Sequence, residues 1–255
     1  MLGRRGNDMR NCVSILDIDI DNITMDIAVE KIIQFLQEDR NHIVCTPNAE
    51  IMMKSYRDEE LKKILKNADI LIADGAGVVL ASKILKTPLK ERIAGYDLVQ
   101  NILKLKLDRK IRVFLLGGAP NIAKVAIEKY SYLDGIEFVG YNDGYFTKEE
   151  EPNIIDRINS LNTDVLLVGL GAPKQEKWMY DNKDKLNVKV SIGVGGTFDV
   201  MAQVVKRAPK FFQDHGLEWF YRLCKQPKRF IRMLDLPKFV LLVIWKRISL
   251  SLRSK

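Results

Sequence analysis

The stretch "DVLLVGLGAPKQEKW" (164–178) joins an apolar run, a glycine-rich turn and a charged segment typical of a helix start. Its aliphatic run is typical of a strand buried on both faces of a parallel sheet. The turn lacks the Gly-Lys-Ser/Thr sequence of a P-loop. It also lacks the third glycine and the distal acid of a dinucleotide fingerprint. What remains is a set of backbone N–H groups at a helix N-terminus, beside Gly171, Lys174 and Gln175. We interpret this turn as an anion site that could hold a diphosphate.

Five further runs of the same character lie on either side of this stretch, with helical patterns between them. They are "HIVCTPN" (42–48), "ADILIADG" (68–75), "IRVFLLGG" (111–118), "GIEFVG" (135–140) and "VKVSIGVGG" (188–196). In "TMDIAVEKIIQFLQED" (24–39), Thr24 can cap a helix that carries an apolar stripe. This alternation predicts an α/β domain over residues 1–205, with a doubly wound, mostly parallel, Rossmann-like sheet. Ligands of such sheets bind at the carboxyl ends of the strands.

Asp74 follows the run "ILIA" and is therefore expected at a strand end, partly sheltered by apolar neighbours. Burial would raise the pKa of its carboxyl and suit it to act as a general base. The alternative is that Asp74 caps the following helix, "AGVVLASKIL". The residues alone leave both readings open.

Thr46 and Asn48 lie in "CTPNAEIM", also between a strand and a helix. Both side chains are short hydrogen-bonding groups suited to sugar hydroxyls or an acetamido group. An ordinary N-cap is the favoured reading of Asn48. A second glycine-rich turn, "LLGGAP" (115–120), contains Gly117 and Gly118 at another strand end. The two turns could flank one ligand.

The segment "DIDID" (17–21) contains the D-x-D pattern by which many sugar-nucleotide transferases bind a divalent metal. Its strict alternation also predicts a strand or hairpin, and this second reading is favoured. The three cysteines are far apart, which argues against a disulfide framework, and the two isolated histidines argue against a zinc centre. No apolar run approaches the roughly 20 residues that span a bilayer, and no secretory signal is evident. We expect a cytoplasmic protein.

The basic excess of the chain is confined to its last fifth. Residues 206–255 contain 13 lysines and arginines against three acidic residues, whereas the remainder has a net charge of −2. Prolines 209, 227 and 237 predict a helical appendage of about three short helices. Arg222, Arg229 and Arg232 could clamp a diphosphate, or they could simply contact solvent or anionic lipid.

The run "FVLLVIW" (239–245) suits an amphipathic segment in the lipid headgroup region, and it could equally promote homo-oligomers in water. We therefore expect the appendage to complete the active site and to bind an anionic membrane surface. Nucleic-acid binding is disfavoured, because the body is slightly acidic and no nucleic-acid motif is present.

Taken together, these segments resemble the WecG/TagA/CpsF glycosyltransferase family, most closely its TagA-type branch. The matching segments extend over roughly residues 15 to 235. They are "TPNAEI", "ADGAGVV", "RIAGYDL", "FLLGGAP", "GYNDGYF", "LLVGLGAPKQEKW", "GVGGTFDV", "KRAPKFF" and "GLEWFYRLCKQPKRF". One departure stands out: Gln203, in "FDVMAQ", lies where the family more often has an Ala-Gly pair. We expect this departure to affect the joint between body and appendage.

The resemblance implies an inverting, metal-independent transferase that needs no cofactor. It would move N-acetylmannosamine from UDP-ManNAc to undecaprenyl-diphosphate-GlcNAc in wall teichoic acid synthesis, at the inner face of the cell membrane. Carried over to this chain, the catalytic residues are Thr46, Asp74 and Gln175. Arg92 and the tail arginines Arg222, Arg229 and Arg232 are implied to bind phosphate. Together with residues at the predicted strand ends, the expected substrate-binding set is Asn48, Arg92, Gly117, Gly118, Tyr141, Gly171, Lys174, Arg222, Arg229 and Arg232.

Two alternatives remain open at this point. A sister activity of the same family would use UDP-ManNAcA or UDP-glucose as the donor. A function of another class would be a membrane- or polyanion-binding module with a nucleotide-regulated body, which would bind UDP-sugars without consuming them.

Overall fold

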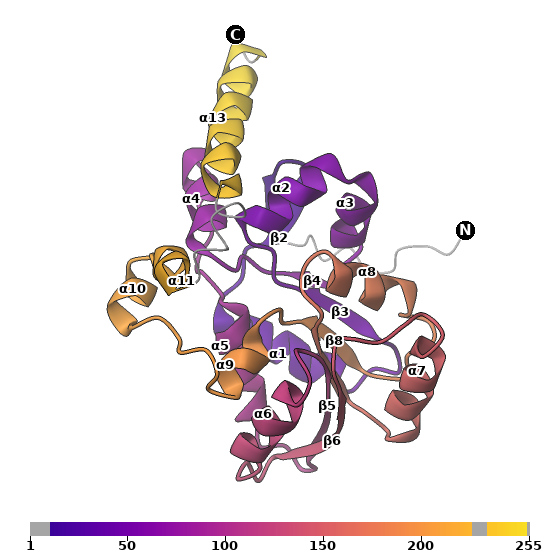
Figure 1. The fold of residues 1–255 in the computed structure, drawn as a ribbon. Helices are drawn as coiled ribbons and strands as arrows, with labels where there is room; N and C mark the ends of the chain where they lie inside the picture. The colour runs from indigo at the N-terminus through magenta and orange to yellow at the C-terminus, as the bar shows by residue number, and fades with distance from the viewer. Residues whose placement is uncertain (1–10, 226–233, 254–255) are drawn as a thin grey trace, which may run out of the picture.

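The computed structural model describes residues 11–225 and 234–253 (Figure 1). Within these ranges six strands form one sheet in the order β4-β3-β8-β7-β5-β6, and all neighbouring strands are parallel. The strands are β3 (His42–Cys45), β4 (Ile70–Leu71), β5 (Ile111–Gly117), β6 (Ile136–Asn142), β7 (Val165–Gly169) and β8 (Val190–Gly193). The predicted parallel α/β sheet is confirmed, and each of the six apolar runs supplies one strand.

Both faces of the central strands are buried, which explains why these strands are mostly apolar. Successive side chains of a strand point to opposite faces. In β5, Phe114 and Leu116 pack into one core cluster, while Val113 and Leu115 pack into the other. All four are fully buried. Each such side chain contributes about 1.5–3 kcal/mol on burial, so the two clusters hold the sheet between its helices.

Helices from along the chain supply the two clusters. The first cluster includes residues of α2 (Ala49–Arg57), α3 (Glu59–Lys66), α4 (Ala76–Ile84), α7 (Glu151–Ser160) and α8 (Lys174–Asp181). The second includes residues of α1 (Met25–Phe35), α5 (Gly95–Leu103), α6 (Ile122–Tyr130) and α9 (Thr197–Met201). The predicted cap of α1 is confirmed, since the Thr24 hydroxyl oxygen accepts a hydrogen bond from the Ile27 N–H at 3.5 Å.

The "DIDID" segment forms part of the turn and the second strand of an antiparallel hairpin, β1 (Cys12–Ile15) and β2 (Ile18–Asp21). Leu16 and Asp17 link the strands with positive φ values of 52° and 65°, as a two-residue primed turn requires. Asp21 is buried and accepts a hydrogen bond from the Leu71 N–H at 2.7 Å. The hairpin reading of this segment is therefore confirmed, and Asp21 joins the hairpin to β4.

Gln203 lies just past the end of α9, and its backbone is left-handed, with φ of 60°. This is the position after a helix at which glycine is favoured, because a Cβ makes the conformation costly. The side chain of Gln203 accepts a hydrogen bond from Lys129 Nζ at 3.2 Å. Gln203 is thus a left-handed helix end, and the effect expected of it on the joint between body and appendage stays a prediction.

After α9 the chain forms α10 (Lys210–Asp214), α11 (Glu218–Lys225) and the long α13 (Asp235–Arg253). Pro237 lies in the first turn of α13, where its missing N–H has no helical partner to lose, so this proline marks the start of a helix. Pro209 is the N-cap of α10, and residue 227 lies outside the described residues. The appendage is therefore helical as predicted, with one helix much longer than expected.

α13 packs against α2 and α4 with its first half and extends beyond the body with its second (Figure 1). Phe239 and Val243 are fully buried in this contact. Leu241, Trp245 and Leu252 are exposed. Within the described ranges, none of the helices has the length and hydropathy needed to cross a bilayer.

Candidate active site

A cavity of about 290 Å³ opens at the carboxyl ends of β3, β4, β7 and β8. It combines side chains from segments far apart in the sequence, as the parallel sheet predicts. Six residues singled out from the sequence line it: Thr46, Asn48, Asp74, Gly171, Lys174 and Gln175. Further polar lining residues are Glu50, Tyr96, Arg207 and Glu218.

Thr46 follows β3 and is buried. Its hydroxyl donates a hydrogen bond to the Gly193 carbonyl oxygen at 3.1 Å, which joins the ends of β3 and β8. A Cβ on Gly95 would lie 3.2 Å from the Thr46 hydroxyl oxygen, so α5 begins directly against this side chain. Thr46 is therefore held in one position at the cavity wall.

Asn48 is the N-cap of α2, as the sequence favoured. Its side-chain oxygen accepts a hydrogen bond from the Ile51 N–H at 3.0 Å. It also lines the cavity, so the capping role does not remove it from the site. One turn into α2, Glu50 pairs with Lys54 at 2.8 Å, and Lys54 also donates to the Ala172 carbonyl oxygen at 3.1 Å. These contacts tie α2 to the turn after β7.

Asp74 follows β4 and is half-buried at the cavity wall. Its backbone N–H donates to the Pro47 carbonyl oxygen at 3.1 Å, which joins the ends of β3 and β4. The N-cap of α4 is Gly75, with φ of 111°, rather than Asp74. The position of Asp74 is thus that of a group facing the site rather than that of a helix cap.

The turn after β7 borders the cavity with an unusually open glycine. Gly171 has φ of 76°, and a Cβ placed on it would meet no atom within 4 Å. Lys174 donates to the Gly144 carbonyl oxygen at 3.2 Å, and its ammonium lies 5.0 Å from the centre of the Phe146 ring. The Gln175 N–H is already bonded to the Gly171 carbonyl oxygen at 2.9 Å, so this amide of the predicted anion site is occupied.

Gln175 is buried and uses both ends of its side-chain amide. Its oxygen accepts from the Gly195 N–H at 3.0 Å, and its nitrogen donates to Glu176 Oε1 at 2.8 Å. The Glu176 carboxyl is also buried, and its second oxygen has no hydrogen-bond partner among the described residues. Burial raises the pKa of Glu176, and the hydrogen bond from Gln175 opposes that rise. Gln175 therefore links the turns after β7 and β8 with its side-chain oxygen and contacts a buried carboxyl with its nitrogen.

Sequence reasoning missed Glu176. A signal was available, because Glu176 precedes the buried Met179 by three residues and so lies on the core face of α8.

The turn after β5 does not reach the cavity lining. A Cβ on Gly117 would lie 2.4 Å from the carbonyl carbon and oxygen of Gly169. The Gly118 N–H donates to the Gly169 carbonyl oxygen at 3.1 Å, so this predicted anion donor is also occupied. Tyr141 belongs to β6 and packs against the second core cluster. The ligand contacts expected of Gly117, Gly118 and Tyr141 stay predictions.

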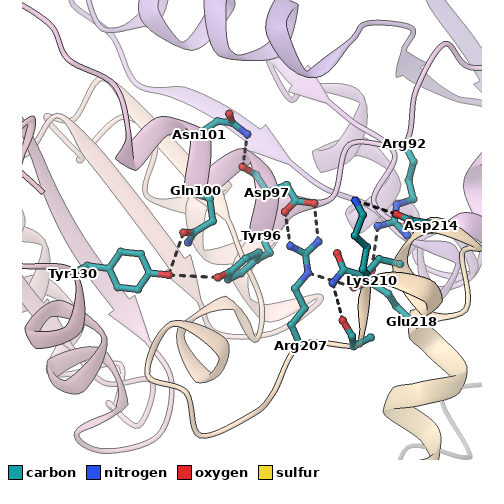
Figure 2. Close-up of polar contacts among 12 residues, drawn as sticks. Arg92, Tyr96, Asp97, Gln100, Asn101, Tyr130, Arg207, Lys210, Asp214 and Glu218 are labelled. Atoms are coloured by element: carbon teal, nitrogen blue, oxygen red, sulfur yellow. Dashed lines mark hydrogen bonds and ion pairs between the residues drawn. The ribbon is translucent and has the colours of Figure 1, made fainter.

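A group of ion pairs borders the cavity where the appendage meets the body (Figure 2). Arg92 contacts Glu218 of α11, with Nη2 3.1 Å from Oε2. Arg207 forms a bidentate pair with Asp97, at 2.6 and 2.7 Å, and its Nε lies 3.5 Å from Glu218 Oε1. Its guanidinium also lies 4.8 Å from the centre of the Tyr96 ring. Arg92 therefore does not line the cavity itself but contacts Glu218, which does.

Arg207 and Glu218 were not identified from the sequence, although both lie in segments that carry the family resemblance, "KRAPKFF" and "GLEWFYRLCKQPKRF". Of the three predicted tail arginines, Arg222 belongs to α11, whereas Arg229 and Arg232 lie outside the described residues. Within the described ranges, no group of three or more His, Cys, Asp or Glu side chains is arranged to hold a metal ion.

Comparisons with known proteins place this geometry in a family context. A family model described as "Glycosyl transferase WecG/TagA/CpsF family" matches residues 13–253. Three similar proteins share the name N-acetylglucosaminyldiphosphoundecaprenol N-acetyl-beta-D-mannosaminyltransferase. The one from Bacillus spizizenii is 38% identical over 82% of this chain and 81% of its own length. Those from Bacillus subtilis and Staphylococcus aureus are 36% and 35% identical, over 79% and 89% of this chain and 78% and 90% of their own lengths.

Proposed function

Because the chain belongs to the WecG/TagA/CpsF family of glycosyltransferases, we propose that it transfers N-acetylmannosamine from UDP-ManNAc to undecaprenyl-diphosphate-linked GlcNAc. The reaction would form a β-1,4 linkage with inversion, in the synthesis of the wall teichoic acid linkage unit. The names of three relatives at 35–38% identity carry the choice of sugar and acceptor. The observation that supports the chemistry is the cavity itself, in which Thr46, Asp74 and Gln175 meet at four strand ends.

In the proposed reaction, Asp74 acts as the general base. Its carboxylate takes the proton from the C4 hydroxyl of the acceptor GlcNAc as that oxygen attacks the anomeric carbon of ManNAc. The bond between the anomeric carbon and the diphosphate oxygen breaks, and UDP leaves with the electron pair. Two observations support this role: Asp74 lies at the cavity wall, and the cap of α4 is the neighbouring Gly75.

Thr46 and Gln175 would hold the reacting groups in place. Both are buried, and each bonds to the end of β8, Thr46 through the Gly193 carbonyl and Gln175 through the Gly195 N–H. A side chain fixed in this way can orient a substrate at little entropic cost, and orientation supplies much of the rate in such displacements. The leaving diphosphate needs positive partners. Lys174 and Arg207 line the cavity and are candidates for that role.

The proposal includes a location at the inner face of the cell membrane, where the lipid-linked acceptor would be found. α13 carries exposed apolar residues at Leu241, Trp245 and Leu252 and an exposed lysine, Lys238, whereas its Lys246 and Arg247 contact Asp17 and the Ile84 carbonyl of the body. The exposed apolar side chains suit a surface that inserts among lipid headgroups. Trp245→Ser should weaken binding to anionic vesicles in a sedimentation assay and leave thermal stability unchanged.

The decisive experiment is a UDP-release assay with a short-chain acceptor, GlcNAc-diphosphate-lipid, and a panel of UDP-sugars. We expect UDP-ManNAc to be consumed only in the presence of the acceptor. Asp74→Asn should lower the rate by at least about a hundredfold and leave UDP affinity nearly unchanged, because it removes the base but not the binding cations. Asp19→Asn, on the exposed face of the hairpin, is the matched control. Full activity of Asp74→Asn, or preference for UDP-ManNAcA or UDP-glucose, would contradict the corresponding part of the proposal.

A further inference from the structure

Glu218 occupies a position between two arginines at the rim of the cavity (Figure 2). One carboxylate oxygen lies 3.1 Å from Arg92, and the other lies 3.5 Å from Arg207. All three side chains are largely sheltered, with 16–23% of each exposed. Two guanidinium groups that converge on one carboxylate form an arrangement that also fits a phosphate group, because both anions accept hydrogen bonds from the same planar donors.

The two arginines are not held equally by their partners. Arg207 is fixed by its bidentate pair with Asp97, at 2.6 and 2.7 Å, and by the face of the Tyr96 ring. Its contact with Glu218 is longer, at 3.5 Å, and exceeds a normal hydrogen bond. Arg207 would therefore keep its position if Glu218 left. The Glu218 carboxylate is the exchangeable member of the group.

The charge of the cavity favours such an exchange. Three acidic residues line it, Glu50, Asp74 and Glu218, against two basic residues, Lys174 and Arg207. A diphosphate would enter a cavity whose lining is net acidic. Two backbone amides expected to receive it, those of Gly118 and Gln175, already donate to backbone carbonyls. Displacing the Glu218 carboxylate would leave two acidic and two basic residues in the lining, and it would free Arg92 and the Nε of Arg207 to contact the incoming anion.

We propose that Arg92 and Arg207 form the seat of the donor diphosphate and that Glu218 occupies this seat until the nucleotide displaces it. This inference rests on the proposed use of a UDP-sugar. It joins Arg207 and Arg92 in one seat, and it gives Glu218 the role of a competing anion. The affinity for a nucleoside diphosphate is then lower than the two arginines alone would provide, because binding must first break the Glu218 ion pairs.

The test is calorimetric titration of the full chain with UDP and, separately, with uridine, which lacks the diphosphate. Glu218→Gln keeps the shape of the side chain and removes its charge. We expect it to tighten UDP binding about tenfold and to leave uridine binding unchanged. Arg207→Lys keeps a cation beside Asp97 but loses the planar fork, and it should weaken UDP binding severalfold without affecting uridine.

Asp214→Asn is the matched control, because it removes the same charge from the neighbouring α10, where Asp214 pairs with the exposed Lys210 (Figure 2). It should leave both affinities unchanged. A second test combines Glu218→Gln with Arg92→Gln: if the two groups act through one seat, the gain from Glu218→Gln should shrink in the double variant. Thermal melting of each variant checks that it is folded.

The inference is overturned if Glu218→Gln leaves UDP affinity unchanged or weakens it. It is also overturned if Asp214→Asn gives the same gain, or if uridine binding tightens equally. Failure of the proposed function has a different signature. Suppose that Glu218→Gln raises the affinity for UDP but not for uridine, and that no UDP-sugar is consumed in the presence of acceptor. The diphosphate seat is then supported and the transferase function is contradicted. If UDP binds neither the wild type nor Glu218→Gln, the proposed diphosphate seat and the proposed transferase function are both contradicted.

Discussion

The turns after β5 and β7 have nearly the same residues, "LLGGAP" (115–120) and "VGLGAP" (168–173), but they use their glycines for different purposes. After β5, Gly117 is required because the backbone of Gly169 lies where its Cβ would be. After β7, Gly171 has open space beside it and lines the cavity. The first turn lets the two strand ends pack closely, and the second borders a ligand site. In this protein, the glycine-rich turn that borders the cavity is the one with empty space beside its glycine.

The largest expected effect tests the crowded turn. Gly117→Ala places a Cβ 2.4 Å from two backbone atoms of Gly169, at φ of 128°, so neither neighbour can move away cheaply. We expect a loss of about 3 kcal/mol or more in the free energy of unfolding. Urea denaturation followed by circular dichroism measures it. A loss below about 1 kcal/mol would mean that the two turns are not rigidly packed.

The second effect tests the support of the open turn. Gln175→Ala removes the acceptor for the Gly195 N–H and the donor to the buried Glu176. We expect a loss of about 2 kcal/mol in unfolding free energy, together with a more than tenfold fall in transfer rate. Lys177→Ala removes only the partly exposed ion pairs of the same helix with Asp58 and Glu60, so it should change stability by about 1 kcal/mol or less and leave the rate unaltered. Full transfer activity of Gln175→Ala would show that the turn after β7 does not need the Gln175 side chain for the reaction.

The third effect isolates the cost of the left-handed backbone from that of crowding. Gly171→Ala should cost only about 1 kcal/mol of stability, because no atom lies near the added methyl group. The methyl enters the cavity, so the KM for the donor should rise. Gln203→Gly is the reverse substitution at a second left-handed position, with φ of 60°, and it should stabilise the protein by up to about 1 kcal/mol. The comparison is supported if Gly171→Ala lowers the free energy of unfolding and Gln203→Gly raises it. It is contradicted if both substitutions change the free energy of unfolding in the same direction.

The smallest effect is a change in pH dependence at the carboxyl behind the open turn. The pKa of Glu176 is raised above its ordinary value of 4.5, so the folded protein binds more protons than the unfolded chain just above that pH. The Glu176 contribution to stability should therefore fall as pH rises from 4.5 through the raised pKa. Glu176→Gln imitates the protonated form and lacks this titration. The stability difference, variant minus wild type, should increase with pH in urea titrations between pH 4.5 and 8, and a flat difference would contradict a buried, titrating Glu176.

Much of the body could be predicted because its strands are buried on both faces. Continuous apolar runs mark such strands, and the rule that their carboxyl ends meet brought Thr46, Asp74 and Gln175 together correctly. The strand order could not be predicted, because it depends on which edges pair rather than on any single run. The run 68–75 shows the limit: only Ile70–Leu71 form the ladder of β4, and the following residues turn toward the cavity.

The part of the site that escaped prediction comes from segments without periodic patterns. Arg207 and Glu218 reach the cavity because the chain after α9 returns across the strand ends, a path set by tertiary packing. Gly117 was misleading for a related reason, since its crowding by Gly169 arises between strands distant in sequence. Side chains at strand ends can be anticipated from topology, whereas contacts made by a returning loop cannot.

The place of β8 in the sheet has a consequence for how the enzyme matures on the ribosome. β8 follows every other described strand in the chain but lies between β3 and β7 in space. Until β8 has been synthesised, no strand can fill the place between β3 and β7, and the partners of Thr46 and Gln175 do not yet exist. The site can therefore form only late in translation, and a chain truncated before residue 190 would lack the groups that hold these two side chains.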